Sequence, residues 1–203
     1  RMNKKLQSQI NEIRKLFDKT VEQDNERKKI LENQNEKLEQ MVTIRTDEVV
    51  RQKAEIESKN RDIIDNLRYA KRIQEAILPE IKLIYQTLQN SFIIYLPKDI
   101  VSGDFYSFAQ KNNKVIIAAV DCTGHGVTGA FMSMIGTSLL NQIINENGVT
   151  QPAQILTHLN SGIKEALKQS EGENELHDGM DIALCSLDLD NYKLVYAGAN
   201  RPL

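Results

Sequence analysis

The first 78 residues contain neither glycine nor proline, which leaves them very few kinds of structure. They are rich in Glu, Lys, Gln, Asn and Arg, and their apolar residues recur at heptad-like intervals. Such a stretch of good helix formers without a breaker predicts one continuous α-helix. Pro79 is the first proline of the chain and is expected to end that helix.

The apolar residues of this helix fall on two seams that are displaced by one residue. The first seam contains Ile10, Ile13, Phe17, Leu31, Leu38 and Met41, and the second contains Val42, Val49, Ile56, Ile63 and Ala70. The step of eleven residues from Leu38 to Val49 is typical of a stutter in a coiled coil. We therefore predict a weak, parallel, homodimeric coiled coil over residues 1–66, with polar Lys53 and Asn60 on its seam. The alternative is a solvated single helix, which would be marginal in water.

Residues 67–79 are denser in apolar groups than the helix before them. Tyr69, Ala70, Ile73, Ala76 and Ile77 share one helical face. This pattern predicts a linker or switch helix where the stalk meets a globular part formed by residues 80–203.

The globular part alternates between strand-like and helix-like segments. Strands are predicted at 92–96, 105–110, 115–120, 182–187 and 194–199, helices at 127–146 and 152–169, and a polar loop at 170–178. Consecutive strands, then two helices, then further strands indicate an α+β fold with a mainly antiparallel sheet.

The first hairpin brings two carboxylates together. Asn112 and Asn113 suit a tight turn because asparagine tolerates positive φ. If Lys111 faces Lys114, Asp104 falls opposite Asp121, and directly opposed Cβ atoms lie about 4.5–5.5 Å apart. Two carboxylates at that distance repel, and a divalent cation removes the conflict. The alternative is a pair of strand-end aspartates that cap turns and point apart.

Composition argues against several functional classes. The 26 basic and 28 acidic residues leave no basic excess, which argues against a general nucleic-acid binder. We find no secretory signal and no apolar run near eighteen residues, so the sequence predicts no membrane-spanning segment. Cys122 and Cys185 lack the spacing of metal-binding cysteines, so we predict that they are reduced thiols of a cytoplasmic domain. This prediction also suits a cytoplasmic domain of a protein that is tethered to a membrane by another segment.

Four motifs occur in order along the globular part. They are Val-Ser-Gly-Asp-Phe-Tyr at 101–106, Asp-Cys-Thr-Gly-His-Gly at 121–126, Gly-Met-Asp at 179–181 and Tyr-Ala-Gly-Ala-Asn-Arg-Pro-Leu at 196–203. Together they resemble the RsbU/SpoIIE-type branch of the PPM metal-dependent serine/threonine protein phosphatases. Residues 69–79 resemble the linker helix that precedes these domains.

The resemblance implies two stacked β-sheets flanked by helices and a pair of Mn²⁺ or Mg²⁺ ions at one sheet edge. By position, Asp121 resembles the carboxylate that bridges the metals, Cys122 the residue whose backbone carbonyl is a ligand, and Asp104 a further acidic ligand. His125 is a candidate to protonate the leaving oxygen, and its alternative role is to cap the following helix or shape the turn. Asp181 could be a further metal ligand, but we favour a strand-start residue that binds loop amides. Arg201 could contact phosphate, but we favour a solvated side chain.

The resemblance also implies a phosphatase that acts on a small regulatory phosphoprotein, such as an anti-sigma-factor antagonist, under control of an upstream sensor. A shift of the stalk would move the helix at 67–78 and adjust the aspartate pair. Residues 80–203 correspond to the N-terminal part of such a domain, before its later metal-binding aspartates. We therefore expect the chain as it stands to be almost inactive. The alternative function is a non-catalytic dimeric signalling or scaffolding module with a degenerate phosphatase fold.

Overall fold

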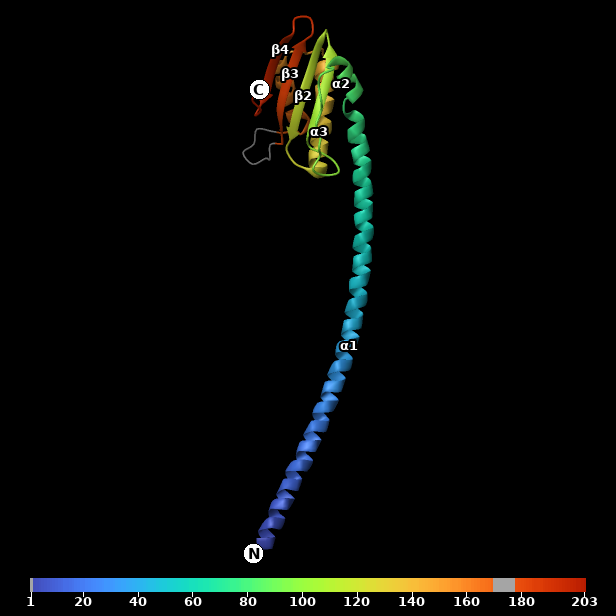
Figure 1. Ribbon diagram of the computed structural model, residues 1–203, viewed down its shortest axis with the longest axis vertical. Helices are drawn as coiled ribbons and strands as arrows, with labels where there is room; N and C mark the ends of the chain where they lie inside the picture. The colour runs from blue at the N-terminus through green and yellow to red at the C-terminus, as the bar shows by residue number, and fades with distance from the viewer. Residues whose placement is uncertain (1, 170–177) are drawn as a thin grey trace. The chain divides into compact units, whose positions relative to one another are not determined.

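The computed structural model describes residues 2–169 and 178–203, so most of the predicted loop at 170–178 lies outside the described residues. The chain divides into two units, residues 1–61 and 62–203. Its elements in order are α1 (Met2–Ile77), α2 (Ile81–Thr87), β1 (Phe105–Lys111), β2 (Lys114–Cys122), α3 (Gly126–Asn141), the π-helical turn η1 (Gln142–Glu146), α4 (Pro152–Ala166), β3 (Met180–Asp188) and β4 (Lys193–Ala199) (Figure 1). The predicted α+β fold class is confirmed.

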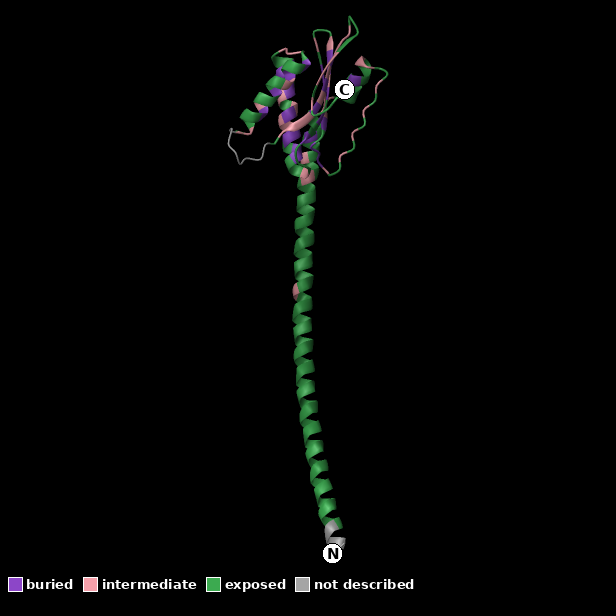
Figure 2. Cartoon of the chain, turned by 90° about the vertical axis from the view of Figure 1, so that its left-hand side faces the viewer, coloured by how far each residue is buried: buried purple, intermediate pink, exposed green. Residues whose placement is uncertain are grey.

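The first unit consists of α1 alone, and the predicted continuous helix is confirmed. Its apolar seam residues are exposed in the single chain, for example Phe17 at 65% and Ile56 at 58% (Figure 2). A helix that buries no face of its own chain gains stability only from propensity and i,i+4 pairs, which are weak. The helix ends at Ile77, two residues before Pro79.

The globular unit is built on one antiparallel sheet with strand order β1-β2-β3-β4. The predicted first hairpin is confirmed in register, because Lys111 pairs with Lys114 and Phe105 pairs with Val120. Asn112 and Asn113 form its turn with φ of 49° and 58°. The pairing of β2 with β3, which joins the two hairpins into one sheet, was not predicted from the sequence.

Helices cover the two faces of the sheet unequally. One face carries the main core, where α3, η1 and α4 pack against β1, β2 and β3 through residues such as Leu140, Ile144, Ile155, Ile116 and Leu184. The opposite face carries a smaller cluster of Ile84 from α2 with Phe108 and Val115. Because side chains alternate along a strand, the residues between those of the main core point to this less covered face.

The helical stretch Gly126–Glu146 bears on the predicted absence of a membrane segment. It has 21 residues and a mean hydropathy of 1.3, so by length and composition it meets the criteria for a membrane span. One such helix is weak evidence for a membrane span, because a core helix of a folded domain meets the same criteria, so the prediction of no membrane-spanning segment stays a prediction. In the fold this stretch contributes Met132, Leu140, Ile143 and Ile144 to the main core, which accounts for its apolar character.

The predicted strand at 92–96 is wrong, because the backbone there belongs to no helix or strand. The burial of its side chains nevertheless alternates along the segment. Ile93 packs against the smaller cluster, and the Tyr95 ring meets the Tyr106 ring edge-on at 5.7 Å. Phe92 and Leu96 on the other side are 79% and 86% exposed. The alternation of apolar residues was read correctly, but no ladder of hydrogen bonds joins this segment to another strand among the described residues. The implied second sheet is likewise not formed by them.

The end of α1 is tied to the globular unit by one buried amide. Gln74 is 4% exposed, and its Nε2 donates to the Ser102 carbonyl at 2.6 Å and to Ser133 Oγ at 2.7 Å. Its Oε1 accepts the Ser102 backbone N–H at 3.0 Å. Ser102 Oγ in turn accepts the backbone N–H of Asp104 at 3.1 Å. A single side chain therefore links α1, α3 and the segment that carries Asp104.

Replacing Gln74 with leucine should destabilise the globular unit. The variant keeps the side-chain volume but leaves buried backbone groups of Ser102 without partners, which should cost about 2–4 kcal/mol. Urea denaturation followed by tyrosine fluorescence reports on this unit, because all six tyrosines lie between residues 69 and 196. Gln52→Leu, on the exposed surface of α1, is the matched control and should change stability by less than about 0.5 kcal/mol. Equal stability of the two variants would contradict the linking role of Gln74.

Candidate metal centre

The strand registers place acidic residues side by side at one end of the sheet. Asp121 on β2 pairs directly with Asp181 on β3. Phe105 pairs with Val120, so the next position along β1 sets Asp104 opposite Asp121. All three alternate with residues of the main core and therefore lie on the less covered face. We call Asp104, Asp121 and Asp181 the acidic row.

Asn200 and Arg201, just beyond β4, complete the acidic row on its far side. Asn200 Nδ2 donates to Asp181 Oδ1 at 3.0 Å. Arg201 Nη2 lies 2.5 Å from Asp121 Oδ2 and 3.5 Å from Asp181 Oδ2. Arg201 is thus half exposed and also paired with two carboxylates, and Asp181 accepts a hydrogen bond from a side-chain amide of the turn after β4. The pairing of β2 with β3 brings these residues together, and no local sequence pattern encodes it.

The titration of Asp104 shows that the acidic row interacts electrostatically. Partial burial raises the pKa of Asp104 above its ordinary value, and the neighbouring Asp121 raises it further by repulsion and by a shared hydrogen bond. Arg201 acts in the opposite direction and lowers the same pKa. The alternative in which the two aspartates point apart is not what the structure shows.

Two glycines, Gly103 and Gly129, allow the Asp104 segment to pack closely against α3 and the loop at Gly124. A Cβ on Gly129 would lie 2.7 Å from the Gly124 carbonyl oxygen and 2.8 Å from the Gly103 Cα. A Cβ on Gly103 would lie 2.9 Å from the same Gly124 oxygen. Both contacts are with backbone, which cannot move aside cheaply. Only residues without a Cβ permit this approach, so Gly103 and Gly129 both serve to position the Asp104 segment.

Cys122 fits the role predicted for its backbone rather than its side chain. Its carbonyl oxygen faces the Asp104 segment, because a Cβ on Gly103 would lie 3.4 Å from it. Burial, together with the negative charges of Asp104 and Asp121, raises the pKa of the Cys122 thiol to about 12. The thiol is therefore neutral at physiological pH and is neither a nucleophile nor a thiolate ligand.

His125 stands at the N-cap position of α3, where its side chain makes no capping hydrogen bond. Its side chain is 85% exposed, and its Nδ1 lies 3.5 Å from Asp99 Oδ2. His125 therefore occupies the predicted N-cap position, but without a capping bond from its side chain. Asp99, which lies beside the ring, was not identified from the sequence, and no motif there marks it. The catalytic role of His125 stays a prediction.

The acidic row suits a hard divalent cation, with part of the coordination shell left to water. Carboxylate and carbonyl oxygens are the ligands such cations prefer, and Mg²⁺ commonly takes only one or two carboxylates. Asp104, Asp121 and the Cys122 carbonyl provide such oxygens from adjoining backbone segments. Among residues 2–169 and 178–203, no three His, Cys, Asp or Glu side chains gather closely enough to hold a metal by themselves. The described residues therefore fit part of a metal centre.

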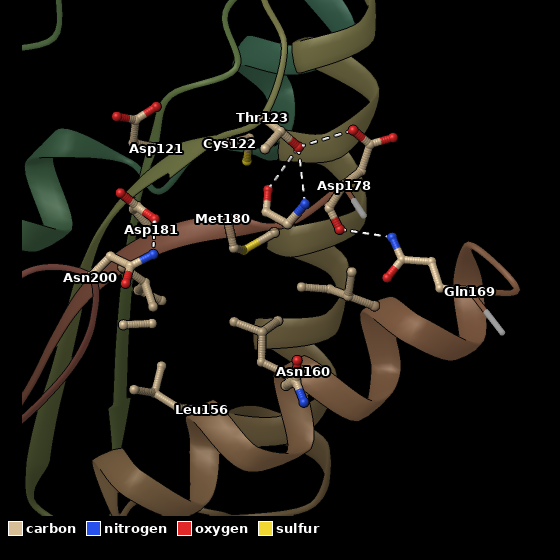
Figure 3. Close-up of a pocket in the computed structure, with 15 residues that line it drawn as sticks. Asp121, Cys122, Thr123, Leu156, Asn160, Gln169, Asp178, Met180, Asp181 and Asn200 are labelled. Carbon is tan, nitrogen blue, oxygen red and sulfur yellow. Dashed lines mark hydrogen bonds between the residues drawn. The ribbon is translucent and has the colours of Figure 1, made fainter. Parts of the chain in front are cut away.

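Two cavities adjoin the acidic row. One of about 450 Å³ lies between α4 and the strand ends, with Leu156, Asn160 and Met180 in its wall (Figure 3). Thr123 Oγ1 bridges Asp178 and Gly179 at its rim (Figure 3). The other, of about 460 Å³, lies on the less covered face between segment 92–97 and the sheet, and reaches Asp104, Asp121 and Arg201.

Comparison with known proteins adds two findings to this geometry. Residues 111–203 match the family described as Stage II sporulation protein E (SpoIIE). The solved structure of the SiaA-PP2C domain of Pseudomonas aeruginosa is similar, with 35% sequence identity and a TM-score of 0.61. That similarity covers 69% of this chain, and the chain spans 55% of the SiaA-PP2C chain. A search of curated proteins gave no match.

Replacing Asp104 with asparagine should stabilise the metal-free protein near pH 7. The folded-state pKa of Asp104 is raised, so its charge opposes folding at any pH above that pKa. With EDTA present, Asp104→Asn should raise the Tm by about 1–3 °C. The advantage should vanish as the pH falls through the raised pKa, because the wild-type carboxyl group is then neutral. Calorimetry between pH 7 and pH 4 measures this trend.

Asp188→Asn is a control of opposite sign. Hydrogen bonds from the backbone N–H groups of Asn191 and Asp190 lower the pKa of Asp188. Its charge therefore favours folding above its unfolded pKa, and this contribution is lost as the pH falls. Asp188→Asn should lower the Tm near pH 7. The same response from both variants would mean that the repulsion at Asp104 is absent.

Proposed function

The chain belongs to the SpoIIE-type branch of the PPM phosphatases, and we propose that its acidic row is the metal centre of a serine/threonine phosphoprotein phosphatase. The observation that carries the proposal is the register of β1 and β2, which sets Asp104 beside Asp121 on the open face of the sheet. The raised pKa of Asp104 supports it, because partial burial and then the neighbouring carboxylate of Asp121 both raise it. The wall of the adjoining cavity includes both residues, which gives a phosphorylated side chain a route to them.

Each residue of the centre has a distinct role in this proposal. Asp104, Asp121 and the Cys122 carbonyl would supply part of the ligands for a pair of divalent ions, either Mn²⁺ or Mg²⁺. When bound, such ions polarise a phosphoryl oxygen and make hydroxide available near neutral pH. The neutral Cys122 thiol takes no part, so the chain needs no nucleophile of its own. His125, oriented by Asp99, is the candidate that gives a proton to the leaving serine or threonine oxygen.

We propose a small regulatory phosphoprotein as the substrate, such as an anti-sigma-factor antagonist, and an upstream sensor as the source of control. A cytoplasmic location is consistent with the free thiols of Cys122 and Cys185. We further propose that α1 pairs with a second copy. Both seams are exposed in the single chain, and pairing would bury them.

Gln74 suggests how control could reach the centre. A displacement of the end of α1 would act on Ser102 through the buried amide, and through Ser102 on the backbone of Asp104. This chain of hydrogen bonds supports the proposal that the stalk regulates the phosphatase by shifting residues 67–78. It supplies a two-state element that an upstream sensor can bias.

A non-catalytic scaffold is the second candidate function. The observation in its favour is the ion pair of Arg201 with Asp121, which balances part of the acidic row without any metal. The two candidates differ in whether the row binds a divalent cation and whether that cation supports phosphate release.

Mn²⁺ binding tests the phosphatase proposal directly. Millimolar MnCl₂ should raise the Tm of this chain by about 2–5 °C relative to EDTA, and Asp121→Asn should abolish most of the shift. Manganese-dependent hydrolysis of a phosphoserine peptide should be brisk only in a form of the protein that spans the whole SiaA-PP2C length, since this chain covers 55% of it. An identical Tm with and without Mn²⁺ would favour the scaffold instead. Equal Tm shifts in the wild type and in Asp121→Asn would do the same.

The mass of the chain in solution tests the dimer. Light scattering coupled to size-exclusion chromatography should give twice the 23.1 kDa of one chain. Ile56→Asp places a charge on the second seam and should return the mass to that of a single chain. Ile44→Asp is the matched control, because Ile44 is also exposed, at 66% against 58% for Ile56, but lies off both seams. Dimers that survive Ile56→Asp would place the interface elsewhere.

A further inference from the structure

Arg201 crosses two strands to reach its partners. It follows the end of β4, yet its Nη2 contacts Asp181 on β3 at 3.5 Å and Asp121 on β2 at 2.5 Å. Neighbouring strands are about 4.8 Å apart, so this reach uses most of the length of the side chain. One cation therefore serves two members of the acidic row, Asp121 and Asp181.

The backbone of Arg201 is held independently of its side chain. The Tyr196 hydroxyl donates a hydrogen bond to the Arg201 carbonyl oxygen. Gly198 makes this possible, because a Cβ at that position would collide with the same oxygen. The turn after β4 thus stays in place when the guanidinium moves, and only the ion pairs fix the outer part of the side chain.

These ion pairs are weak enough to be exchanged. The Arg201 side chain is 46% exposed and that of Asp121 is 55% exposed, so solvent screens their attraction. Exposed pairs of this kind shift an equilibrium by about fivefold at most. A divalent cation on the same carboxylate oxygen would both compete with the guanidinium and repel it.

We propose that Arg201 is a displaceable cation of the acidic row that becomes a phosphate-binding residue once a metal takes Asp121. The inference rests on the proposed phosphatase function. A guanidinium presents planar pairs of N–H donors that match phosphoryl oxygens, and a released Arg201 remains at the rim of the cavity that reaches Asp121. The competing view is that Arg201 only fastens β4 to the sheet. In that case its removal lowers stability but changes neither metal nor phosphate affinity.

Two affinities separate these views, both measured by calorimetry on the 203-residue chain. Arg201→Gln should bind Mn²⁺ about two- to fivefold more tightly than wild type, because it removes a competitor. With Mn²⁺ saturating, it should bind phenylphosphonate, a non-hydrolysable phosphate monoester mimic, about tenfold more weakly. Arg201→Lys keeps the charge but not the fork, and should give intermediate phosphonate affinity. Lys164→Gln makes the same change in net charge on the exposed side of α4 and should leave both constants within about twofold of wild type.

The outcomes distinguish failure of the inference from failure of the proposed function. If Asp121→Asn weakens Mn²⁺ binding but Arg201→Gln alters neither affinity, the metal centre stands and the role of Arg201 is wrong. If Arg201→Gln weakens both, Arg201 supports the fold rather than competing with metal, and the inference is overturned. If Asp121→Asn leaves Mn²⁺ binding unchanged, or no Mn²⁺ binds to the wild type, both the inference and the proposed metal centre fall.

Discussion

The register of the first hairpin is the constraint on which the rest of the site depends. Side chains alternate between faces with a period of two, so a slip of one residue in β1 or β2 would exchange core and site. Val120 and Phe105 would leave the main core, and Asp121 would be driven beneath α3 and α4. One register of the hairpin therefore determines both the burial of the apolar residues and the exposure of the acidic row. The two asparagines at the turn, both with positive φ, favour that choice locally.

The sequence was most informative where structure is decided locally. Turn chemistry and apolar alternation were enough to place Asp104 opposite Asp121, and the absence of breakers was enough for α1. What failed depends on contacts between distant segments. Segment 92–96 has the alternation of a strand but lacks a bonded neighbour, and Arg201 reaches Asp121 only because β2 and β3 pair across an intervening stretch of helices. A short stretch of sequence does not show which strand will pair with which. It also does not show which side chain will extend across a neighbouring strand.

Two glycines and Gln74 explain how the short loop before β1 fixes the position of the Asp104 carboxylate. Gly103 and Gly129 remove the side chains that would keep the Asp104 segment from α3 and the loop at Gly124. Gln74 fixes the same segment from the other side, through both backbone groups of Ser102. This loop is therefore held by close backbone contact on one side and by a buried amide on the other.

The exposure of the acidic row determines what kind of site it can be. Had Asp121 and Arg201 been fully buried, their separation would leave two uncompensated charges and would be too costly for a reversible exchange. At about half exposure, water and salt take over much of that cost, so the pair restrains the carboxylates without locking them. The same exposure makes the repulsion between Asp104 and Asp121 tolerable in the absence of a cation. A row of aspartates at one end of the sheet, balanced by one half-exposed arginine, is thus compatible with the exchange of cations.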